Sequence, residues 1–381
     1  MRTVCVVTGT RAEYGILRPV MRAIEASANL RLQVFVTGMH LEKRHGETIA
    51  EVRRDFEIAA SMPMSPEVDT GPCVGKALGQ GIAGMVEQFE RLKPDVVMVL
   101  GDRVEALAGA LAGLFCGGCV AHVHGGEVTR GGYDEVMRHA ITKLAHLHFA
   151  ATEQSMERII RMGERAENVF LVGAPGLDEA LAGPSLEKEE LAARLDVDLD
   201  GTVILVVQHP VSTRPDDAGA EMTETMEAVL DGDATVVVVY PNNDPGGRRM
   251  IEVIRGYEGR ANVRTFPNIA RTEFLSLLRY VVVLVGNSSS GIIEAPSFAL
   301  PVVNVGERQA GRERAANVID VAPRRRDIRV AVRKCLHDKD FRQSLAGMEN
   351  PWGDGHAAER IVEILETVSI DHELLQKQLT H

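Results

Sequence analysis

Cysteines are few in this sequence, and their spacing is irregular. The five residues Cys5, Cys73, Cys116, Cys119 and Cys335 are an odd, scattered set, whereas a disulfide framework uses paired cysteines. We therefore expect reduced thiols and a cytoplasmic protein. Only Cys116 and Cys119 form a C-x-x-C, and no second Cys or His pair stands at zinc-ligand spacing. We interpret them as small buried residues and expect no metal site.

Long apolar runs and an excess of basic residues are also lacking. No apolar run approaches the length that spans a bilayer, and the start MRTVCVVTGT lacks the apolar region and cleavage site of a secretory signal. The formal net charge is -12, whereas nucleic acids and membrane surfaces attract clustered Lys and Arg. We expect neither as a partner, so local groups must bind any anionic ligand.

Two common nucleotide-binding motifs are absent after the first predicted strand. Neither G-x-G-x-x-G nor a Walker lysine follows it, and TGTRAEYG resembles the first only superficially. This disfavours nicotinamide-dependent dehydrogenases and P-loop NTPases. No cofactor is expected.

Short β-branched runs recur along the chain and alternate with segments of helical periodicity. They lie at residues 4–9, 30–38, 95–102, 119–126, 147–152, 168–173, 202–210, 234–243, 262–268, 281–287 and 301–306. Near-continuous apolar strands between helices are typical of parallel sheets covered on both faces. The sequence predicts an α/β protein with two doubly wound Rossmann-like domains facing a cleft.

A polar, charged segment, GPSLEKEELAARLDVDLDGT, separates the sixth run from the seventh. We place the domain boundary there, which gives an N-terminal domain of residues 1–175 and a C-terminal domain of residues 176–354. Residues 355–381 are amphipathic without a strand partner, and we expect them to cross back onto the first domain.

Polar residues follow nearly every predicted strand, where parallel sheets bind ligands. They include Arg11, Glu13, His40, Asp102, Arg103, Glu105, His122, His124, Glu127, Asp134, His209, Asn242, Asn243 and Arg308. Any one of them is explained as a helix cap or turn former, but their convergence indicates acid–base chemistry on an anionic substrate. His40, His124 and Asn243 are candidate substrate-binding residues.

The segment VGNSSSGIIEAP joins a buried strand to a helix. Backbone amides at a helix start, the hydroxyls of Ser288, Ser289 and Ser290, and the close approach that Gly291 permits together favour a phosphate cradle. Glu294 would repel a phosphate, so its role is predicted to be hydrogen bonding to a ribose diol. Alternatively, with Gly291 as the cap, Glu294 completes a capping box.

A set of motifs in a fixed order resembles a known family. TGTRAEYG, GDRVEA, HVHGGE, DEVMRHAITKLAHLHF, QHPV, GNSSSGIIEAPSFALPVVNVGERQAGR and NPWGDGHAAERI are similar to those of the hydrolysing nucleotide-sugar 2-epimerases, the UDP-N-acetylglucosamine 2-epimerase family. The resemblance runs from about Arg2 to Ile364. It implies a GT-B-type fold, a nucleotide held by the C-terminal domain, and a homodimer or homotetramer.

The resemblance also implies a reaction. A UDP-linked 2-acetamido sugar eliminates to a 2-acetamidoglycal, water adds, and the free 2-epimer and UDP are released. The sugar is N-acetylglucosamine, on the way to sialic acid, or a 2,4-diacetamido-trideoxy sugar, on the way to legionaminic acid. Relatives carry a catalytic glutamate where this chain has His124, so Glu127 or Asp134 must serve instead.

The remaining roles follow from this chemistry. Proton transfer is assigned to Asp102, Glu127 and Asp134. Arg11, the serine cradle and His209, as a donor or acid, stabilise the departing diphosphate, and Arg308 either clamps the phosphates or pairs with nearby acids. The alternatives are a non-hydrolysing epimerase, a GDP-sugar-specific relative, a GT-B glycosyltransferase, and a sugar-nucleotide-binding regulator without turnover.

Overall fold

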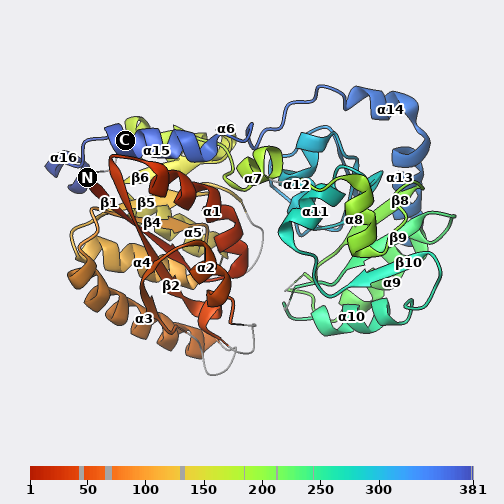
Figure 1. Cartoon of the computed structure of the whole chain (residues 1–381), viewed down its shortest axis with the longest axis horizontal. Coiled ribbons are helices and arrows are strands. Elements are labelled where there is room, and N and C mark those ends of the chain that lie inside the picture. Colours follow the sequence, from red (N-terminus) through yellow and green to blue (C-terminus); the bar gives the residue numbers. More distant parts are fainter. Residues whose placement is uncertain are drawn as a thin grey trace. The chain divides into compact units, whose positions relative to one another are not determined.

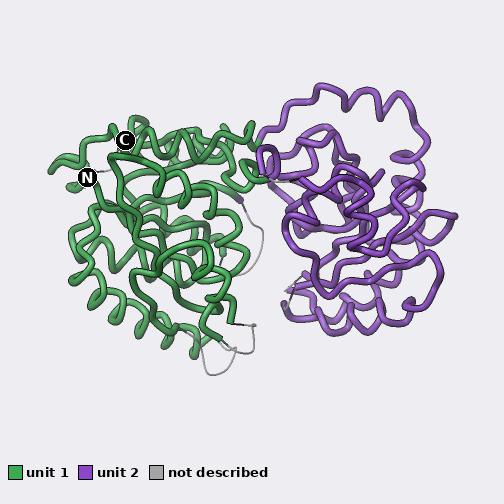
Figure 2. The backbone as a smooth tube through the Cα atoms, viewed as in Figure 1, with its two compact units in different colours: residues 1–127, 133–179, 352–381 green, residues 128–132, 180–351 purple. Residues whose placement is uncertain are grey.

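The chain forms two compact units, shown in different colours in Figure 2. The computed structural model describes residues 1–42, 47–64, 71–128, 134–183, 185–211, 213–242, 244–378 and 380. Unit 1 contains residues 1–127, 133–179 and 352–381, and unit 2 contains residues 128–132 and 180–351. The sequence-based domain boundaries, after residues 175 and 354, lie a few residues from these divisions.

A parallel sheet of seven strands forms the centre of unit 1, in the order β3-β2-β1-β4-β5-β6-β7 (Figure 1). Its strands are β1 (Arg2–Thr8), β2 (Leu30–Thr37), β3 (Ile58–Met62), β4 (Val96–Leu100), β5 (Cys119–Val123), β6 (Leu147–Ala150) and β7 (Val169–Leu171). β1, β4 and β5 are buried along nearly their whole length. Residues of β1 alternate between two apolar layers, one containing Val4 and Val6 and the other Cys5 and Val7. The sheet is therefore covered on both faces.

The helices of unit 1 follow the strands in alternation. They are α1 (Arg11–Ala26), η1 (Gly38–Leu41), α2 (Ile49–Asp55), α3 (Gly71–Leu92), α4 (Val104–Phe115), α5 (Asp134–Leu144), α6 (Glu153–Arg161), η3 (Ala166–Asn168), α7 (Gly176–Ala182, which continues into unit 2), α15 (Ala357–Thr367) and α16 (His372–Leu375). Because every strand is parallel, the loops from strand to following helix all leave the same edge of the sheet. That edge is where the polar strand-end residues gather.

The C-terminal helix α15 belongs to unit 1, although unit 2 precedes it in the sequence. Ile361 and Leu365 share an apolar cluster with Leu17 of α1. The first amides of α15, from Ala357 and Ala358, donate to the Asp178 carboxylate at 3.0 and 2.6 Å. At the other end, the Arg2 guanidinium donates to the backbone carbonyls of Leu365 and Val368. Both ends of α15 are thus fixed by residues from the first half of the chain.

Unit 2 repeats this plan with a parallel sheet of six strands, in the order β10-β9-β8-β11-β12-β13. The strands are β8 (Val203–Val207), β9 (Thr235–Val239), β10 (Val263–Phe266), β11 (Val283–Gly286), β12 (Val302–Val305) and β13 (Val318–Val321). Its helices are α8 (Lys188–Leu195), α9 (Ala218–Val229), α10 (Gly247–Arg255), α11 (Arg271–Leu277), α12 (Ser290–Ile293), η4 (Ala295–Phe298), α13 (Arg325–His337) and α14 (Lys339–Ser344). Both sheets have the doubly wound order in which the first strand lies in the middle.

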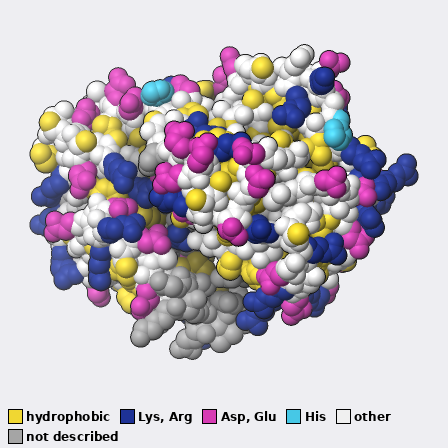
Figure 3. Space-filling model, turned by 45° about the vertical axis from the view of Figure 1, so that its right-hand side comes forward, with side chains coloured by type: hydrophobic (Ala, Val, Ile, Leu, Met, Phe, Trp, Pro, Cys, Tyr) yellow, Lys and Arg dark blue, Asp and Glu magenta, His cyan; other side chains and the backbone are white. Residues whose placement is uncertain are grey.

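The predicted α/β fold class is confirmed by these two parallel sheets with alternating helices. β3 and β13 are additional strands that the sequence analysis did not identify. Basic and acidic side chains are interspersed on the molecular face drawn in Figure 3. Among the described residues, no helix combines the length and apolarity needed to cross a membrane.

Candidate functional site

Ionised side chains form pairs at the C-terminal edge of the unit 1 sheet. Asp102 follows β4 and forms an ion pair with Arg138 of α5. Arg138 is buried, and its second Nη donates to the backbone carbonyl of Glu127 at 3.1 Å. Asp134 lies one turn before Arg138, at the start of the same helix. Arg138 therefore connects the loops after β4 and β5, and brings two of the predicted acids to one place.

The turn after β5 carries a second pair. His124 has a left-handed backbone conformation, with φ of 61°, which is uncommon for a residue with a side chain. Its Nδ1–H donates to the Glu127 carboxylate, and its ring stacks on Trp352 with the centroids 6.4 Å apart. His124 Nε2 is buried and has no hydrogen-bond partner among the described residues. His124 thus holds a predicted catalytic acid, and its predicted contact with substrate stays a prediction.

Two further carboxylates lie buried at the end of β1. Glu105 pairs with the Arg103 guanidinium through two contacts of 3.2 Å. The Glu13 carboxylate accepts the Gly9 amide at 3.0 Å. A Cβ atom on Gly9 would lie 2.8 Å from Glu105 Cγ, and one on Gly38 would lie 2.5 Å from Glu105 Oε1. The glycines of the first two strand ends thus make room for a carboxylate.

This cluster has unusual electrostatics. Burial, followed by the charge of Glu105, raises the pKa of Glu13 to about 7. Burial opposes the charge on Arg103, but Glu105, Glu13 and, more weakly, Asp134 raise the pKa of Arg103. Asp134 therefore lies within electrostatic reach of the same arginine. At this edge of unit 1, the negative charges of the acids and the positive charges of the arginines stabilise one another.

Two other predicted residues of unit 1 have local partners. Arg11 begins α1, and its Nε lies 3.2 Å from the Glu51 carboxylate. His40 is fully buried. Its Nε2 lies 3.1 Å from the Thr8 hydroxyl and its Nδ1 lies 2.7 Å from the Thr48 hydroxyl. Both ring nitrogens have hydroxyl partners, and burial lowers the pKa of His40 to about 4. The predicted substrate contact of His40 stays a prediction.

In unit 2 a hydrogen-bonded pair of neutral side chains lies at the C-terminal edge of the sheet. His209 follows β8, and Asn287 follows β11. The Asn287 side chain accepts the His209 amide at 2.7 Å and donates to the His209 carbonyl at 2.9 Å. Burial, followed by the charge of Arg308, lowers the pKa of His209 to about 3. His209 is therefore held in place as a neutral residue.

The serine segment begins a very short helix. α12 extends only from Ser290 to Ile293, and the Ser290 amide donates to the Ser288 hydroxyl at 3.3 Å. Gly291 is buried, and a Cβ atom on it would lie 2.9 Å from the Val302 side chain. The absence of a side chain at Gly291 therefore permits packing on β12, and its approach to a phosphate stays a prediction. Anion binding by Ser288, Ser289 and Ser290 stays a prediction.

Glu294 and Arg308 lie close to this segment. The Glu294 carboxylate is buried and lies 3.6 Å from the Arg271 guanidinium of α11. The N-cap of α12 is Ser289, so Gly291 lies within the helix and its amide donates to the Ser288 carbonyl at 3.2 Å. The capping-box alternative, which needs Gly291 as the cap, is therefore wrong. Arg308 donates to the Asn287 carbonyl at 3.1 Å. The predicted substrate contact of Asn243 lies outside the described residues.

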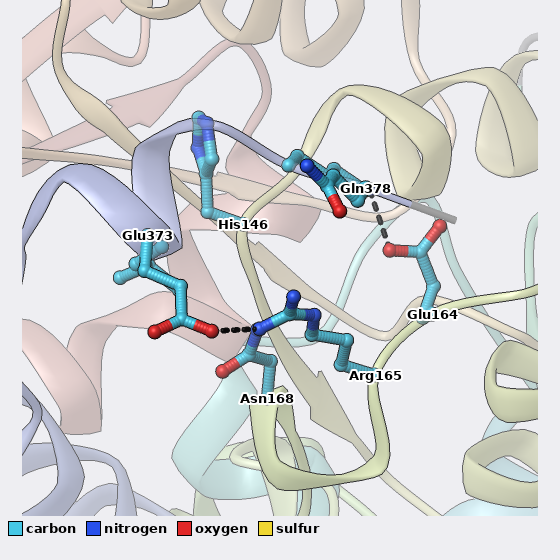
Figure 4. Close-up of a pocket in the computed structure, with 8 residues that line it drawn as sticks. His146, Glu164, Arg165, Asn168, Glu373 and Gln378 are labelled. Atoms are coloured by element: carbon cyan, nitrogen blue, oxygen red, sulfur yellow. Dashed lines mark hydrogen bonds and ion pairs between the residues drawn. The ribbon is translucent and has the colours of Figure 1, made fainter. Parts of the chain in front are cut away.

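A small pocket in unit 1 lies at the opposite edge of the sheet (Figure 4). It is lined by His146, Glu164, Arg165, Asn168, Glu373, Leu374, Lys377 and Gln378. His146 and Asn168 directly precede β6 and β7, which places the pocket at the N-terminal ends of the strands. Ion pairs of 2.6 Å join Arg165 to Glu373 and Lys377 to Glu164. These pairs tie the end of the chain to unit 1, and the pocket is separate from the candidate site.

Sequence reasoning missed the two residues that organise these edges. Arg138 lies inside a predicted helix, and only its spacing of one turn from Asp134 indicates a shared face. Asn287 precedes the serines in the segment that the sequence analysis treated as a phosphate cradle. Neither residue has a sequence signal that identifies its partners.

Comparisons with known proteins give a consistent result. The family model described as UDP-N-acetylglucosamine 2-epimerase matches residues 22–366. The chain is 40% identical to the UDP-N,N'-diacetylbacillosamine 2-epimerase (hydrolyzing) of Legionella pneumophila, over 99% of both chains. It is 35% identical to the UDP-N-acetylglucosamine 2-epimerase of Neisseria meningitidis, over 84% of this chain and 83% of that one.

The fold is similar to solved structures. The crystal structure of UDP-GlcNAc 2-epimerase from Neisseria meningitidis bound to UDP-GlcNAc has a TM-score of 0.82 at 21% identity, covering 96% of this chain and 99% of that chain. At this identity the likeness concerns the fold alone. It agrees with the GT-B-type architecture predicted from the sequence.

Proposed function

This chain belongs to the UDP-N-acetylglucosamine 2-epimerase family, and from that premise we propose that it is a hydrolysing nucleotide-sugar 2-epimerase. Its leading substrate is UDP-N,N'-diacetylbacillosamine, a 2,4-diacetamido-trideoxy sugar nucleotide. The products are the free 2-epimer and UDP. Support for this substrate comes from the Legionella pneumophila relative, a hydrolyzing UDP-N,N'-diacetylbacillosamine 2-epimerase that is 40% identical over 99% of both chains.

The observation that carries the proposal is the junction at Arg138. It pairs with Asp102 and binds the backbone of Glu127, and it lies one helical turn from Asp134. Inverting a carbon centre needs one group to remove a proton and another to return it from the opposite face. The buried Arg138 holds two of these acids, Asp102 through an ion pair and Glu127 through its backbone carbonyl, and two acids can supply such groups.

The reaction balances as an elimination followed by a hydration. A carboxylate removes the proton from C2, the C–H electrons form the C1–C2 double bond, and the C1–O bond breaks with its electrons going to the diphosphate. UDP leaves. A water oxygen then bonds to C1, its proton passes to a carboxylate, and a proton is delivered to the opposite face of C2. The sum is substrate plus water giving the 2-epimer plus UDP, with no metal or nicotinamide required.

The two units contribute different roles. The set of Asp102, Glu127 and Asp134 performs the proton transfers, with His124 orienting Glu127 through its hydrogen bond. Unit 2 holds the nucleotide, with the serine hydroxyls and Arg308 at the diphosphate and Glu294 at the ribose diol. His209 donates a hydrogen bond as charge develops on the leaving oxygen.

The decisive experiment is incubation with UDP-N,N'-diacetylbacillosamine in D2O, followed by NMR of the free sugar. We expect a 2-epimer that carries one solvent deuteron at C2, together with free UDP. Retention of the original C2 hydrogen excludes the elimination. Epimerised sugar that stays attached to UDP identifies the non-hydrolysing reaction, and release only after an acceptor is added identifies a glycosyltransferase.

UDP-N-acetylglucosamine is the second candidate substrate, favoured by the relative that is 35% identical. It lacks the second acetamido group, so the two sugars differ at C4 and C6. Comparing kcat/KM for the two UDP-sugars, and for the GDP-linked forms, ranks the candidates. Binding of every nucleotide without turnover would support the regulatory alternative.

A further inference from the structure

We propose that Asn287 is a positioning residue. By binding the backbone of His209, it keeps the ring where the Asn242 amide holds it as a neutral imidazole with its proton on Nε2. The inference rests on the proposed function only for what His209 does to the substrate. The placement itself rests on the contacts within unit 2.

Asn287 extends the hydrogen-bond ladder between β8 and β11. The last register pair of these strands is Val207 with Gly286, and the Asn287 amide still donates to the Val207 carbonyl at 3.2 Å. Beyond that point the side chain of Asn287 replaces the strand. Its amide group pairs with both the N–H and the C=O of His209, at 2.7 and 2.9 Å. An amide side chain can do this because it carries a donor and an acceptor side by side.

The position of Asn287 is itself fixed from several sides. Gly286 precedes it with φ of 134°, and a Cβ atom on Gly286 would lie 2.1 Å from the Val207 carbonyl oxygen. The Asn287 carbonyl accepts from Arg308 at 3.1 Å and from Gln309 at 2.9 Å. Its side chain is buried. These contacts fix the position of Asn287 at the end of β11, and in that position its side chain binds the backbone of His209.

The tautomer of His209 follows from its other contact. The Asn242 backbone amide lies 3.1 Å from His209 Nδ1. A backbone amide can only donate, so Nδ1 must be the acceptor and carries no proton. In a neutral imidazole the proton is then on Nε2. Within the described part of the chain, every hydrogen bond of His209 involves its backbone or Nδ1, so Nε2–H is left to bind a ligand.

This assignment narrows the chemistry of His209. The pKa of about 3 leaves the ring neutral at physiological pH, because burial and the nearby charge of Arg308 oppose a second proton. His209 is then a hydrogen-bond donor to a phosphate oxygen rather than a proton donor. Removing such a donor costs about 100-fold or more in kcat, and misplacing it through Asn287 should cost about 10-fold to 100-fold.

The test is histidine-ring NMR of the 15N-histidine-labelled full-length protein without substrate. The resonances of His209 are assigned by their loss in His209→Gln. We expect an unprotonated Nδ1 and a protonated Nε2 that do not change between pH 5 and 8. In Asn287→Ala we expect mixed tautomers or a titration within that range. A wild-type ring protonated on Nδ1, or an Asn287→Ala spectrum identical to wild type, overturns the proposal.

A matched control separates positioning from stability. Asn317 is equally buried in unit 2, where its side chain donates to the Leu300 carbonyl at 2.8 Å, and it precedes β13 at the other edge of the sheet. Asn317→Ala should leave the His209 tautomer and kcat unchanged. If the UDP-sugars are not turned over at all, the proposed function is wrong. The NMR result still tests the tautomer of His209, because it needs no substrate. If Asn287→Ala does not fold, the same NMR measurement is made on Asn287→Asp. A spectrum of Asn287→Asp identical to wild type, or a wild-type ring protonated on Nδ1, then overturns the proposal.

Discussion

Units 1 and 2 share one plan of strands but differ in the chemistry of their C-terminal edges. In unit 1 that edge holds ion pairs, Asp102 with Arg138 and Arg103 with Glu105. In unit 2 it holds a neutral histidine gripped by an asparagine amide. Ionised carboxylates can exchange protons, whereas a neutral histidine that several hydrogen bonds hold in place can bind a ligand in one position. This difference matches the proposed division of roles, with proton transfer in unit 1 and nucleotide binding in unit 2.

The largest loss of activity is expected when an acid is removed from the C-terminal edge of unit 1. Asp102→Asn keeps the shape of the side chain but cannot accept a proton, so kcat should fall by about 100-fold or more while the fold is kept. Steady-state kinetics with circular dichroism measure both. Asp95→Asn is the control, because Asp95 lies at the other end of β4, where it accepts the Thr3 amide at 2.7 Å. Near-normal turnover of Asp102→Asn would remove Asp102 from the mechanism.

The second test concerns the pH dependence of the stability of unit 1, which is expected to depend on Glu13. The pKa of Glu13 rises from 4.5 to about 7 on folding, so the folded state binds more protons between these values. The free energy of unfolding should therefore fall as pH rises from about 4.5 to about 7, by on the order of 2 kcal/mol. Glu13→Gln should remove that fall.

The measurement is urea unfolding at several pH values, followed by fluorescence. Trp352 is the single tryptophan of the chain and lies in unit 1, so it reports on the correct unit. Glu25→Gln, at an exposed position of the same helix, is the matched control and should keep the wild-type slope. An unchanged slope in Glu13→Gln would mean that the pKa of Glu13 does not rise on folding.

The smallest expected effect concerns binding alone. Glu294→Gln should raise KM for the UDP-sugar by about 10-fold through a weakened hydrogen bond to the ribose, with kcat within about 2-fold of wild type. Glu273→Gln, on the α11 helix that also carries Arg271, is the control and should leave KM unchanged. A fall in kcat with constant KM would instead place Glu294 in the chemical step.

The interior of the fold was predictable because buried parallel strands are continuous apolar runs. β4 and β8 are VVMVL and VILVV, buried at every position. β3 and β13 lie at sheet edges and were missed, although the other two edge strands, β7 and β10, were predicted. The sequences of β3 and β13, IAASM and VIDV, include small or charged residues at positions open to solvent, so the apolar run that marks a central strand is absent.

The candidate site was predictable by position but not by pairing. Strand topology alone brings Asp102, Glu127 and His209 to C-terminal edges. Which residue holds each one depends on side chains from other elements, such as Arg138 and Asn287. His40 shows the limit of the positional argument, since it follows a strand like the others but has both nitrogens satisfied by threonines.

The return of α15 to unit 1 has a consequence for synthesis on the ribosome. Unit 1 supplies the beginning of the chain, but its apolar cluster includes Ile361 and Leu365, and Arg2 and Asp178 need the ends of α15 as partners. Nearly all of unit 2, residues 180–351, is one continuous segment and can fold as soon as it emerges. The unit that is started first is therefore completed last, and until then it exposes the surface that α15 will cover.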